Sequence, residues 1–291
     1  MNTEDITIQT LKKYNLKANK RFGQNFLIDD NILQGIVEAA DVTSEDIVVE
    51  IGPGLGNLTE YLLKKAKKVV AFEIDENMIE VLQDRFKSNK LEIIFNDILK
   101  VNIDNYIYSI IANMDSFKGK VKVVANLPYY ITTPIIFDLF ENTTMVSDIT
   151  IMIQKEVAER IVAMPGCKEY GVLSVMCRYY SDAELKIQVP PSSFIPQPNV
   201  SSAVITLTKS SKYKLENNEV FVKLVKLAFS QRRKKMVNSL ANTKFLGLSK
   251  DHIVSICREA GIKDGARAEE IGLEKYLHLA EMFIKENKEN K

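Results

Sequence analysis

The sequence predicts an α/β fold built on an open, mostly parallel β-sheet, followed by a smaller helical segment at the C-terminus. Two observations carry this prediction. Apolar, β-branched runs typical of buried strands alternate with amphipathic helical stretches between residues 30 and 208. The first strand leads through a glycine-rich loop, residues 52–56, into a helix, which is the first unit of dinucleotide-type sheets. Ligands of such sheets bind at the carboxyl ends of the strands, so the functional residues are expected there.

Length and composition allow one large domain with an appendage, or two domains. The chain has 291 residues, and its hydrophobic fraction of 46% is sufficient for a core. The net charge is only +1, but it is unevenly distributed. From Lys214 to the C-terminus there are 16 Lys/Arg against 11 Asp/Glu. A basic C-terminal part on a mildly acidic body points to a polyanionic partner.

The cysteines and the hydropathy indicate the compartment. Cys167, Cys177 and Cys257 are scattered, show no CxxC spacing and, with two histidines in the chain, predict no metal cluster. Isolated thiols of this kind are usually buried in the core of proteins from reducing compartments. No apolar run reaches transmembrane length and the N-terminus lacks a signal-peptide pattern. We therefore expect a cytoplasmic protein without a metal or a membrane span.

The N-terminal part precedes the first strand of the sheet. Residues 1–21 are polar and basic, and they predict an arm that is either flexible or in contact with phosphates. The segment Phe22–Leu27 follows, ahead of a helix that Asp29 or Asp30 can cap. This segment either packs on the core as a staple or folds over a bound ligand.

Three strand ends carry chemistry that suits a nucleoside. The strand Ile47–Ile51 leads into the loop Gly52–Gly56, where glycines let the backbone approach a ligand, although GxGxG alone is a weak signal. The strand Val69–Asp75 places Glu73 about twenty residues further on, where an acid reaches both hydroxyls of an unphosphorylated ribose. The next strand ends near Asp97, whose carboxylate can accept a hydrogen bond from an adenine amino group.

A fourth strand, Val123–Ala125, stops abruptly at Asn-Leu-Pro-Tyr. Asn126 offers an amide oxygen as acceptor, and Pro128 fixes the direction of the neighbouring carbonyls. Tyr129 offers a flat face on which a base can stack. Together they suit an exocyclic amine on a flat heterocycle; the alternative is a strand that merely ends in a proline turn.

Two further strands are predicted after residue 147, with a stiff, proline-rich loop between them. Asp148–Ile153 predicts a fifth strand, and Ser201–Thr208 alternates as a further strand. Between them, the proline-rich stretch Pro190–Val200 stays extended and presents Phe194. Phe194 is either a plug of the core or an aromatic opposite Tyr129 that completes a clamp for a flipped base.

Beyond the sheet the pattern is helical. Residues 210–218 form a polar connector, which marks the domain boundary. Four consecutive cations follow in the helical region: Arg232, Arg233, Lys234 and Lys235. A run of four cations usually lies on a solvated helix, but contact with phosphates is the interpretation that agrees with the other motifs.

These motifs occur together in a known family. FGQNFL, EIGPGLG, FEID, NDIL, NLPYY, PGCKEYG, FIPQPNVSSAV and FSQRRKKMVNSL, in this order and spacing, resemble the ribosomal RNA adenine N6,N6-dimethyltransferases over nearly the whole chain. The resemblance is closest to the bacterial small-subunit branch, which dimethylates two adjacent adenosines in a hairpin near the 3′ end of 16S rRNA, in the 30S subunit.

The resemblance implies a fold, a methyl donor, a cellular compartment and a biological role. It implies a Rossmann-like class I methyltransferase sheet with an antiparallel last strand in residues 1–212, including the basic arm 1–21, and a small, all-helical, RNA-binding domain in residues 213–291. The methyl donor would be S-adenosylmethionine, with no metal. The protein would act as a cytoplasmic monomer with a role in small-subunit biogenesis.

Residue roles follow from the motifs of the family. The donor site would comprise Asn25, Leu27, Gly52, Gly54, Glu73, Asp97 and Asn126. The catalytic residues would be Asn126, Pro128, Tyr129 and Phe194, and the RNA contacts would be Arg232, Arg233, Lys234 and Lys235. The Asn126 side chain and the Pro128 carbonyl would accept hydrogen bonds from the adenine N6 amine, while Tyr129 and Phe194 would stack on the base.

Three other functions compete with this interpretation. The macrolide-resistance branch, which acts on 23S rRNA, shares nearly every motif, although the GPGLG loop and the length of the C-terminal domain favour the small-subunit branch. A nicotinamide dehydrogenase is opposed by the GxGxG spacing and by the lack of a catalytic histidine near a strand end. A ribosome-assembly factor would bind the same subunit without methylating it.

Overall fold

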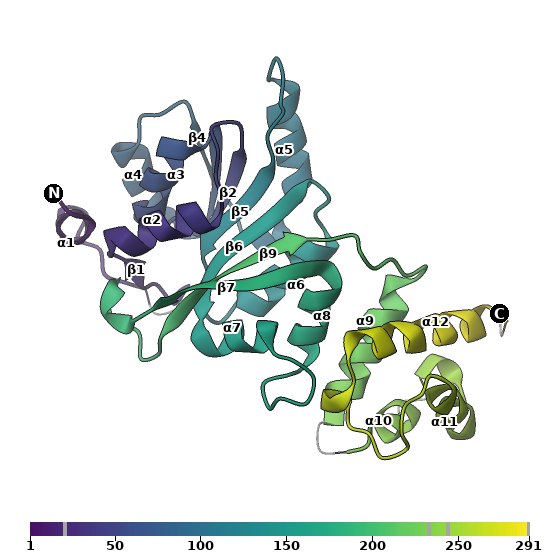
Figure 1. Cartoon of the computed structure of the whole chain (residues 1–291). Helices are drawn as coiled ribbons and strands as arrows, with labels where there is room; N and C mark the ends of the chain where they lie inside the picture. Colours follow the sequence, from purple (N-terminus) through teal and green to yellow (C-terminus); the bar gives the residue numbers. More distant parts are fainter. Residues whose placement is uncertain (20–21, 232–233, 243–244, 290–291) are drawn as a thin grey trace. The chain divides into compact units, whose positions relative to one another are not determined.

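The computed structural model describes residues 1–19, 22–231, 234–242 and 245–289 (Figure 1). The chain forms two compact units: Met1–Ala158 with Glu184–Lys209, and Glu159–Ala183 with Ser210–Lys291. The last of the three changes of unit along the chain, at residue 210, coincides with the polar connector. Residues 159–183 group with the C-terminal helices, which the sequence did not indicate. The functional division into residues 1–212 and 213–291 remains a prediction.

A sheet of seven strands forms the centre of the first unit, counted over the described residues, in the order β4-β3-β2-β5-β6-β9-β7. The strands from β2 to β6 pair in parallel, whereas β9 runs antiparallel to β6. This arrangement confirms the predicted mostly parallel sheet with an antiparallel last strand. The strand bounds are β2 Ile47–Ile51, β3 Lys68–Glu73, β4 Leu91–Phe95, β5 Val121–Asn126, β6 Val146–Gln154, β7 Ser181–Val189 and β9 Ser202–Lys209.

The register of the central strands aligns their carboxyl ends. All five residues of β2 are buried, as expected for a parallel strand that is covered on both faces. Ile51 at its end lies beside Phe72 of β3 and Ala125 of β5. The residues that follow these three positions are Gly52, Glu73 and Asn126, so the register alone brings them to one edge of the sheet.

Helices cover this sheet, and a small second sheet lies beside it. Asp29 caps α2 by accepting hydrogen bonds from the backbone of Asn31 and Ile32, as the sequence predicted. The two-stranded sheet pairs β1, Phe26–Leu27, with β8, Phe194–Ile195. The helices are α1 Thr3–Lys13, α2 Asp30–Ala39, α3 Asn57–Lys65, α4 Glu76–Arg85, α5 Ile103–Ala112, α6 Thr132–Glu141 and α7 Lys155–Val162.

Most of the N-terminal arm is a packed helix. In α1, Asn2 caps the first turn by accepting from the Asp5 amide, and Lys12 and Lys13 lie in the last turn. This distribution of charge matches the helix dipole. Thr3 and Thr7 are buried. Residues 3–13 are therefore neither a flexible arm nor a segment with all its faces free for phosphates.

The second unit is helical, and two buried tyrosines organise it. The Tyr170 hydroxyl donates to the Ile271 carbonyl over 2.9 Å, and the Tyr276 hydroxyl donates to the Ala268 carbonyl over 2.9 Å. The contact of Tyr170 is the physical reason that the PGCKEYG loop groups with the C-terminal helices. The helices are α8 Val172–Tyr180, α9 Asn218–Ala228, α10 Met236–Asn242, α11 Lys250–Glu259 and α12 Leu273–Glu289.

The cysteines only partly follow the sequence-based expectation. Cys177 and Cys257 are buried, and burial raises the pKa of both thiols. Cys167 is exposed, so the expectation that all three are core residues was wrong for this one. In the part of the chain that the structure describes, no group of three or more His, Cys, Asp or Glu side chains could hold a metal ion. Nor is any described helix both long and apolar enough to cross a membrane.

Candidate active site

A pocket lies at the carboxyl edge of the sheet in the first unit. Each residue that the sequence assigned to the donor or to the target amine lines this pocket: Asn25, Leu27, Gly52, Gly54, Glu73, Asp97, Asn126, Pro128, Tyr129 and Phe194. These residues come from six separate strands, strand ends and loops. Because they all line one pocket, the structure supports the interpretation that they form a single ligand site.

The glycine loop forms one wall of the pocket. Gly52, Gly54 and Gly56 have φ values of 67°, 55° and 84°, in the left-handed region that favours glycine. At Gly52 an added Cβ would meet no atom within 4 Å, which shows that the backbone there faces open space. At Gly56 a Cβ would lie 2.4 Å from the Phe86 ring. The loop therefore lines the pocket with open backbone at Gly52 and is tightly packed at Gly56.

Glu73 is fixed against the glycine loop. It is 5% exposed and accepts backbone hydrogen bonds from Gly54 at 3.0 Å, Ile74 at 2.8 Å and Asp75 at 2.9 Å. Burial raises the pKa of this carboxyl, and the three hydrogen bonds oppose the rise. A carboxylate has about four acceptor positions, so capacity for a ligand hydroxyl remains.

Asp97 lies at the end of the neighbouring strand. Its Oδ1 accepts from the Leu99 amide at 3.1 Å and caps a short 3-10 turn, while its Oδ2 lies 3.7 Å from the Lys100 ammonium. Lys100 is 77% exposed, so this ion pair is weak. The Asp97 carboxylate is held in place by its backbone contact and keeps acceptor capacity toward the pocket.

The amide of Asn126 is oriented by the segment Phe22–Leu27. Its Nδ2 donates to the Asn25 carbonyl at 3.3 Å, and the Asn25 side chain donates to the Gly23 carbonyl at 3.1 Å. One Nδ2 hydrogen is used in this contact, and Oδ1 is the acceptor atom of the amide, so Oδ1 is the atom that can accept from an amine. The segment lines the pocket, while Phe26 and Leu27 are also buried in core clusters, so it has features of both alternatives.

The carbonyl of Pro128 is already engaged in a turn. It accepts hydrogen bonds from the Ile131 amide at 3.2 Å and the Thr132 hydroxyl at 3.1 Å. The Leu127 amide donates to the Met152 carbonyl at 3.1 Å, whereas among the described residues the Leu127 carbonyl has no hydrogen-bond partner. Leu127 also lines the pocket. The geometry therefore favours Leu127 over Pro128 as the second acceptor, which the residue types alone did not reveal.

The aromatic residues differ in how accessible they are. Tyr129 is half-buried, and its hydroxyl lies 2.7 Å from the Ser202 hydroxyl at the start of β9. Burial raises the pKa of Tyr129. Phe194 lines the pocket but is only 1% exposed and belongs to a core cluster. In this structure it therefore packs as a core residue, which is the first of the two alternatives given for it above. Tyr130, which was not assigned a role, lines the pocket and is 60% exposed.

A buried acid was missed by the sequence analysis. Glu50 of β2 lines the pocket, is 1% exposed, and its Oε2 has no hydrogen-bond partner in the described structure. Burial raises the pKa of this carboxyl to about 8, and the charge of Glu73 adds to the rise. Glu50 is the one charged residue in the apolar run Ile47–Ile51, and this contrast could have marked it as a candidate site residue. The Thr59 hydroxyl and the charge of Arg85 oppose this rise in the pKa, and the buried oxygen without a hydrogen-bond partner suits a cationic ligand group.

The predicted RNA-binding cations belong to the second unit. Arg232 and Arg233 lie outside the described residues. Lys234 and Lys235 are exposed just ahead of α10. Their surface position is compatible with phosphate contact, and their role remains a prediction.

The sheet order, the glycine loop and the pocket at the carboxyl edge define a class I methyltransferase. Two solved structures share this fold. A dimethyladenosine transferase from Plasmodium falciparum matches with a TM-score of 0.74 at 27% identity, over 90% of this chain and 97% of that one. The 23S rRNA methyltransferase ErmE matches with a TM-score of 0.63 at 25% identity, over 89% of this chain and 99% of that one.

Sequence comparison narrows the class to a family. Residues 15–285 match the family described as ribosomal RNA adenine dimethylase, and the chain belongs to that family. A protein named ribosomal RNA small subunit methyltransferase A from Lachnoclostridium phytofermentans is 44% identical over 282 residues, covering 95% of each chain. A protein of the same name from Clostridioides difficile is 44% identical over 286 residues, covering 97% of this chain and 96% of the relative.

Proposed function

We propose that this protein uses S-adenosylmethionine to dimethylate the N6 amines of two adjacent adenosines in a hairpin near the 3′ end of 16S rRNA, in the 30S subunit. It acts as a cytoplasmic monomer in small-subunit biogenesis. The observation that carries the proposal is the convergence of the donor motifs and the NLPY motif on one pocket. The relatives that are 44% identical and named for the small subunit favour 16S over 23S rRNA as the substrate.

The pocket fits the proposed donor. Glu50 provides a buried carboxyl for an ammonium group, and the open backbone at Gly52 accommodates a close approach. Glu73 would accept from the ribose hydroxyls and Asp97 from the adenine amine. When bound, the donor supplies an electrophilic methyl group on a sulfonium leaving group.

Asn126 and Leu127 would activate the target amine. The lone pair of adenine N6 is delocalised into the ring, which makes the amine a weak nucleophile. Asn126 Oδ1 and the Leu127 carbonyl would accept its two hydrogens and stabilise the positive charge that develops on nitrogen, each contributing roughly 2.7–4 kcal/mol by analogy with oxyanion holes. Each transfer would form an N–C bond as the bond from the methyl carbon to sulfur breaks, and one N6 proton would leave to water. After the first transfer one hydrogen remains on N6, so a single acceptor serves the second transfer.

Ser202 positions the stacking residue in this proposal. Replacing Ser202 with alanine removes the partner of the Tyr129 hydroxyl and lets the ring reorient. We expect kcat/KM for methylation of 30S particles to fall roughly fivefold, the value of one lost hydrogen bond, with donor affinity unchanged. A Tyr129→Phe variant is the matched control and should show a similar loss. A normal rate in Ser202→Ala would show that this bond does not orient Tyr129.

Donor binding is expected to depend on pH through Glu50. Burial raises the pKa of this carboxyl to about 8, so without a cationic partner it is largely neutral at pH 7. Pairing with a cationic donor favours the ionised form and lowers that pKa, so binding near pH 7 should release a proton. Isothermal titration in buffers of different ionisation enthalpy measures the release. The variant Glu50→Gln should bind S-adenosylhomocysteine roughly tenfold more weakly and release no proton.

The proposed function is tested by incubating the protein with methyl-labelled S-adenosylmethionine and unmethylated 30S or 50S particles. The RNA is then digested to nucleosides. Label in N6,N6-dimethyladenosine from 30S alone supports the proposal. Label from 50S assigns the protein to the 23S branch, and binding of 30S without label supports an assembly factor.

A further inference from the structure

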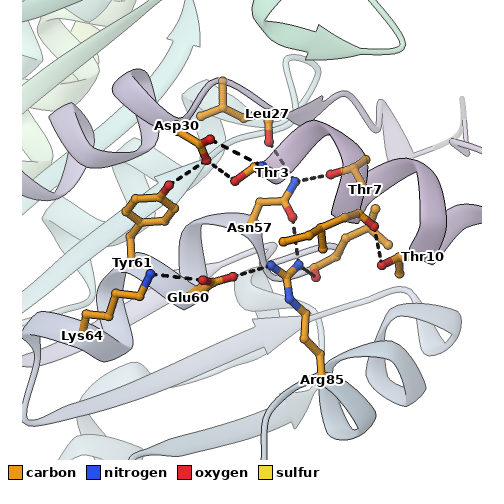
Figure 2. A network of polar contacts seen from close by, with 12 residues as sticks. Thr3, Thr7, Thr10, Leu27, Asp30, Asn57, Glu60, Tyr61, Lys64 and Arg85 are labelled. Atoms are coloured by element: carbon orange, nitrogen blue, oxygen red, sulfur yellow. Dashed lines mark hydrogen bonds and ion pairs between the residues drawn. The ribbon is translucent and has the colours of Figure 1, made fainter. Parts of the chain in front are cut away.

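Asn57, the first residue of α3, forms a junction beside the pocket (Figure 2). It is 6% exposed. Its Nδ2 donates to the Thr7 hydroxyl of α1 at 2.9 Å and to the Leu27 carbonyl at 2.8 Å, while its Oδ1 accepts from Arg85 Nη1 at 2.9 Å. Both hydrogens and the oxygen of the amide are engaged, so three separate segments fix its orientation.

Arg85, the last residue of α4, continues the network into the glycine loop. The same Nη1 donates to the Leu55 carbonyl at 2.7 Å, and Nη2 donates to Glu60 Oε2 at 2.7 Å. The Arg85 side chain is only 14% exposed, so solvent screens these contacts weakly. One guanidinium therefore holds the loop at Leu55 and the first turns of α3 at Asn57 and Glu60.

The helix α1 is anchored to the network by buried polar groups. Thr7 is fully buried, and Thr3 donates through its amide and its hydroxyl to the Asp30 carboxylate of α2. Asp30 also accepts from the Tyr61 hydroxyl of α3 at 2.7 Å. Apolar residues that follow in the chain pack on a cluster beneath the pocket: Leu11, Tyr14, Leu16 and Ala18 against Phe26, Leu55, Met78 and Val81.

We propose that Asn57 and Arg85 are positioning residues for the methyl donor, and that α1 acts on the donor site through Asn57. This inference rests on the proposed function. Leu27 and Leu55 belong to two segments that line the donor pocket, and the Asn57–Arg85 pair holds the backbone carbonyls of both. Removing one partner leaves a buried donor or acceptor unsatisfied and releases one wall of the pocket. The N-terminal arm is thus a structural part of the donor site.

The test measures binding of S-adenosylhomocysteine by isothermal titration, together with steady-state kinetics on 30S particles. Thr7→Val should raise the Kd roughly fivefold, and Arg85→Met roughly tenfold, as expected for the loss of a neutral and a charged hydrogen bond. The KM for the donor should rise in parallel, while kcat at saturating donor stays within about twofold. In an Asn57→Ala background, Thr7→Val should have no further effect on the Kd, because the hydrogen bond that links Thr7 to the pocket through Asn57 is already absent.

The matched control is Asp84→Asn. Asp84 also joins α4 to α1, through Lys13 and Tyr14, but at the surface and away from Asn57. Its Kd should equal that of the wild type. A Thr7→Val protein with a lower Tm but a normal Kd, or Kd effects that add fully in the Asn57→Ala background, would overturn the inference while the proposed function stands. Failure of the wild type to bind S-adenosylhomocysteine would instead overturn the proposed function, and the inference with it.

Discussion

Replacing Asn126 with alanine is expected to reduce methyl transfer by about 10²–10³-fold, the loss measured when one preorganised dipole is removed from a transition state. The reason is that Oδ1 is the acceptor atom of the amide and can accept from the target amine, while one Nδ2 hydrogen donates to the Asn25 carbonyl. The affinity for 30S particles should stay close to that of the wild type, because backbone phosphates dominate RNA affinity. Single-turnover methylation and filter binding measure the two quantities separately.

The variant Asn126→Asp separates the two contacts of this side chain. It keeps an acceptor for the target amine but loses the N–H that holds the Asn25 carbonyl. We expect it to retain more activity than Asn126→Ala and to bind the donor more weakly than the wild type. Methyl transfer at a normal rate in Asn126→Ala would exclude the proposed role of this residue.

Much of the site could be predicted from the sequence because its parts are local. Gly52, Glu73 and Asn126 each directly end a buried strand, and parallel pairing brings such ends to one edge whatever the intervening residues are. The same logic explains why the donor and target motifs line one pocket. The strand pattern likewise predicted the mostly parallel sheet.

Other features depend on contacts that no local pattern encodes. Whether Pro128 or Leu127 offers a free carbonyl is decided by a hydrogen bond from the Thr132 side chain as well as by the turn itself. The grouping of residues 159–183 with the C-terminal helices depends on the burial of Tyr170. The packing of the helix in the basic arm includes a contact of Thr7 with Asn57, which lies fifty residues away in the chain.

A buried ion pair stabilises the opposite edge of the same strands. Lys122 of β5 and Asp46, just ahead of β2, are each 4% exposed at their side chains and lie 3.2 Å apart. Lys122 also donates to the Ala40 and Asp41 carbonyls at the end of α2. Asp46 accepts from the Lys120 amide at 2.8 Å. Burial alone would raise the pKa of Asp46, but these hydrogen bonds and Lys122 lower it.

Replacing Lys122 with methionine keeps the length of the side chain and removes its charge. We expect the free energy of unfolding at pH 7 to fall by roughly 3–5 kcal/mol, because the Asp46 carboxylate stays buried without its partner. Urea unfolding followed by circular dichroism measures the change. The control Lys120→Met removes a lysine that is 62% exposed and 3.6 Å from Asp148, and it should cost about 1 kcal/mol or less.

The pH dependence of stability tests whether the charge of Asp46 causes the loss of unfolding free energy in Lys122→Met. Because the folded protein lowers the pKa of Asp46 below its ordinary value of 3.8, this group stabilises the fold above that value, and the contribution is lost as pH falls through the lowered pKa. A protonated Asp46 needs no cationic partner, so the difference between Lys122→Met and the wild type should shrink as the pH is lowered toward 3. A difference that stays constant would assign the loss to packing instead. At pH 7 the folded variant should keep its donor affinity, since Lys122 lies at the far end of the strands that carry Gly52 and Asn126.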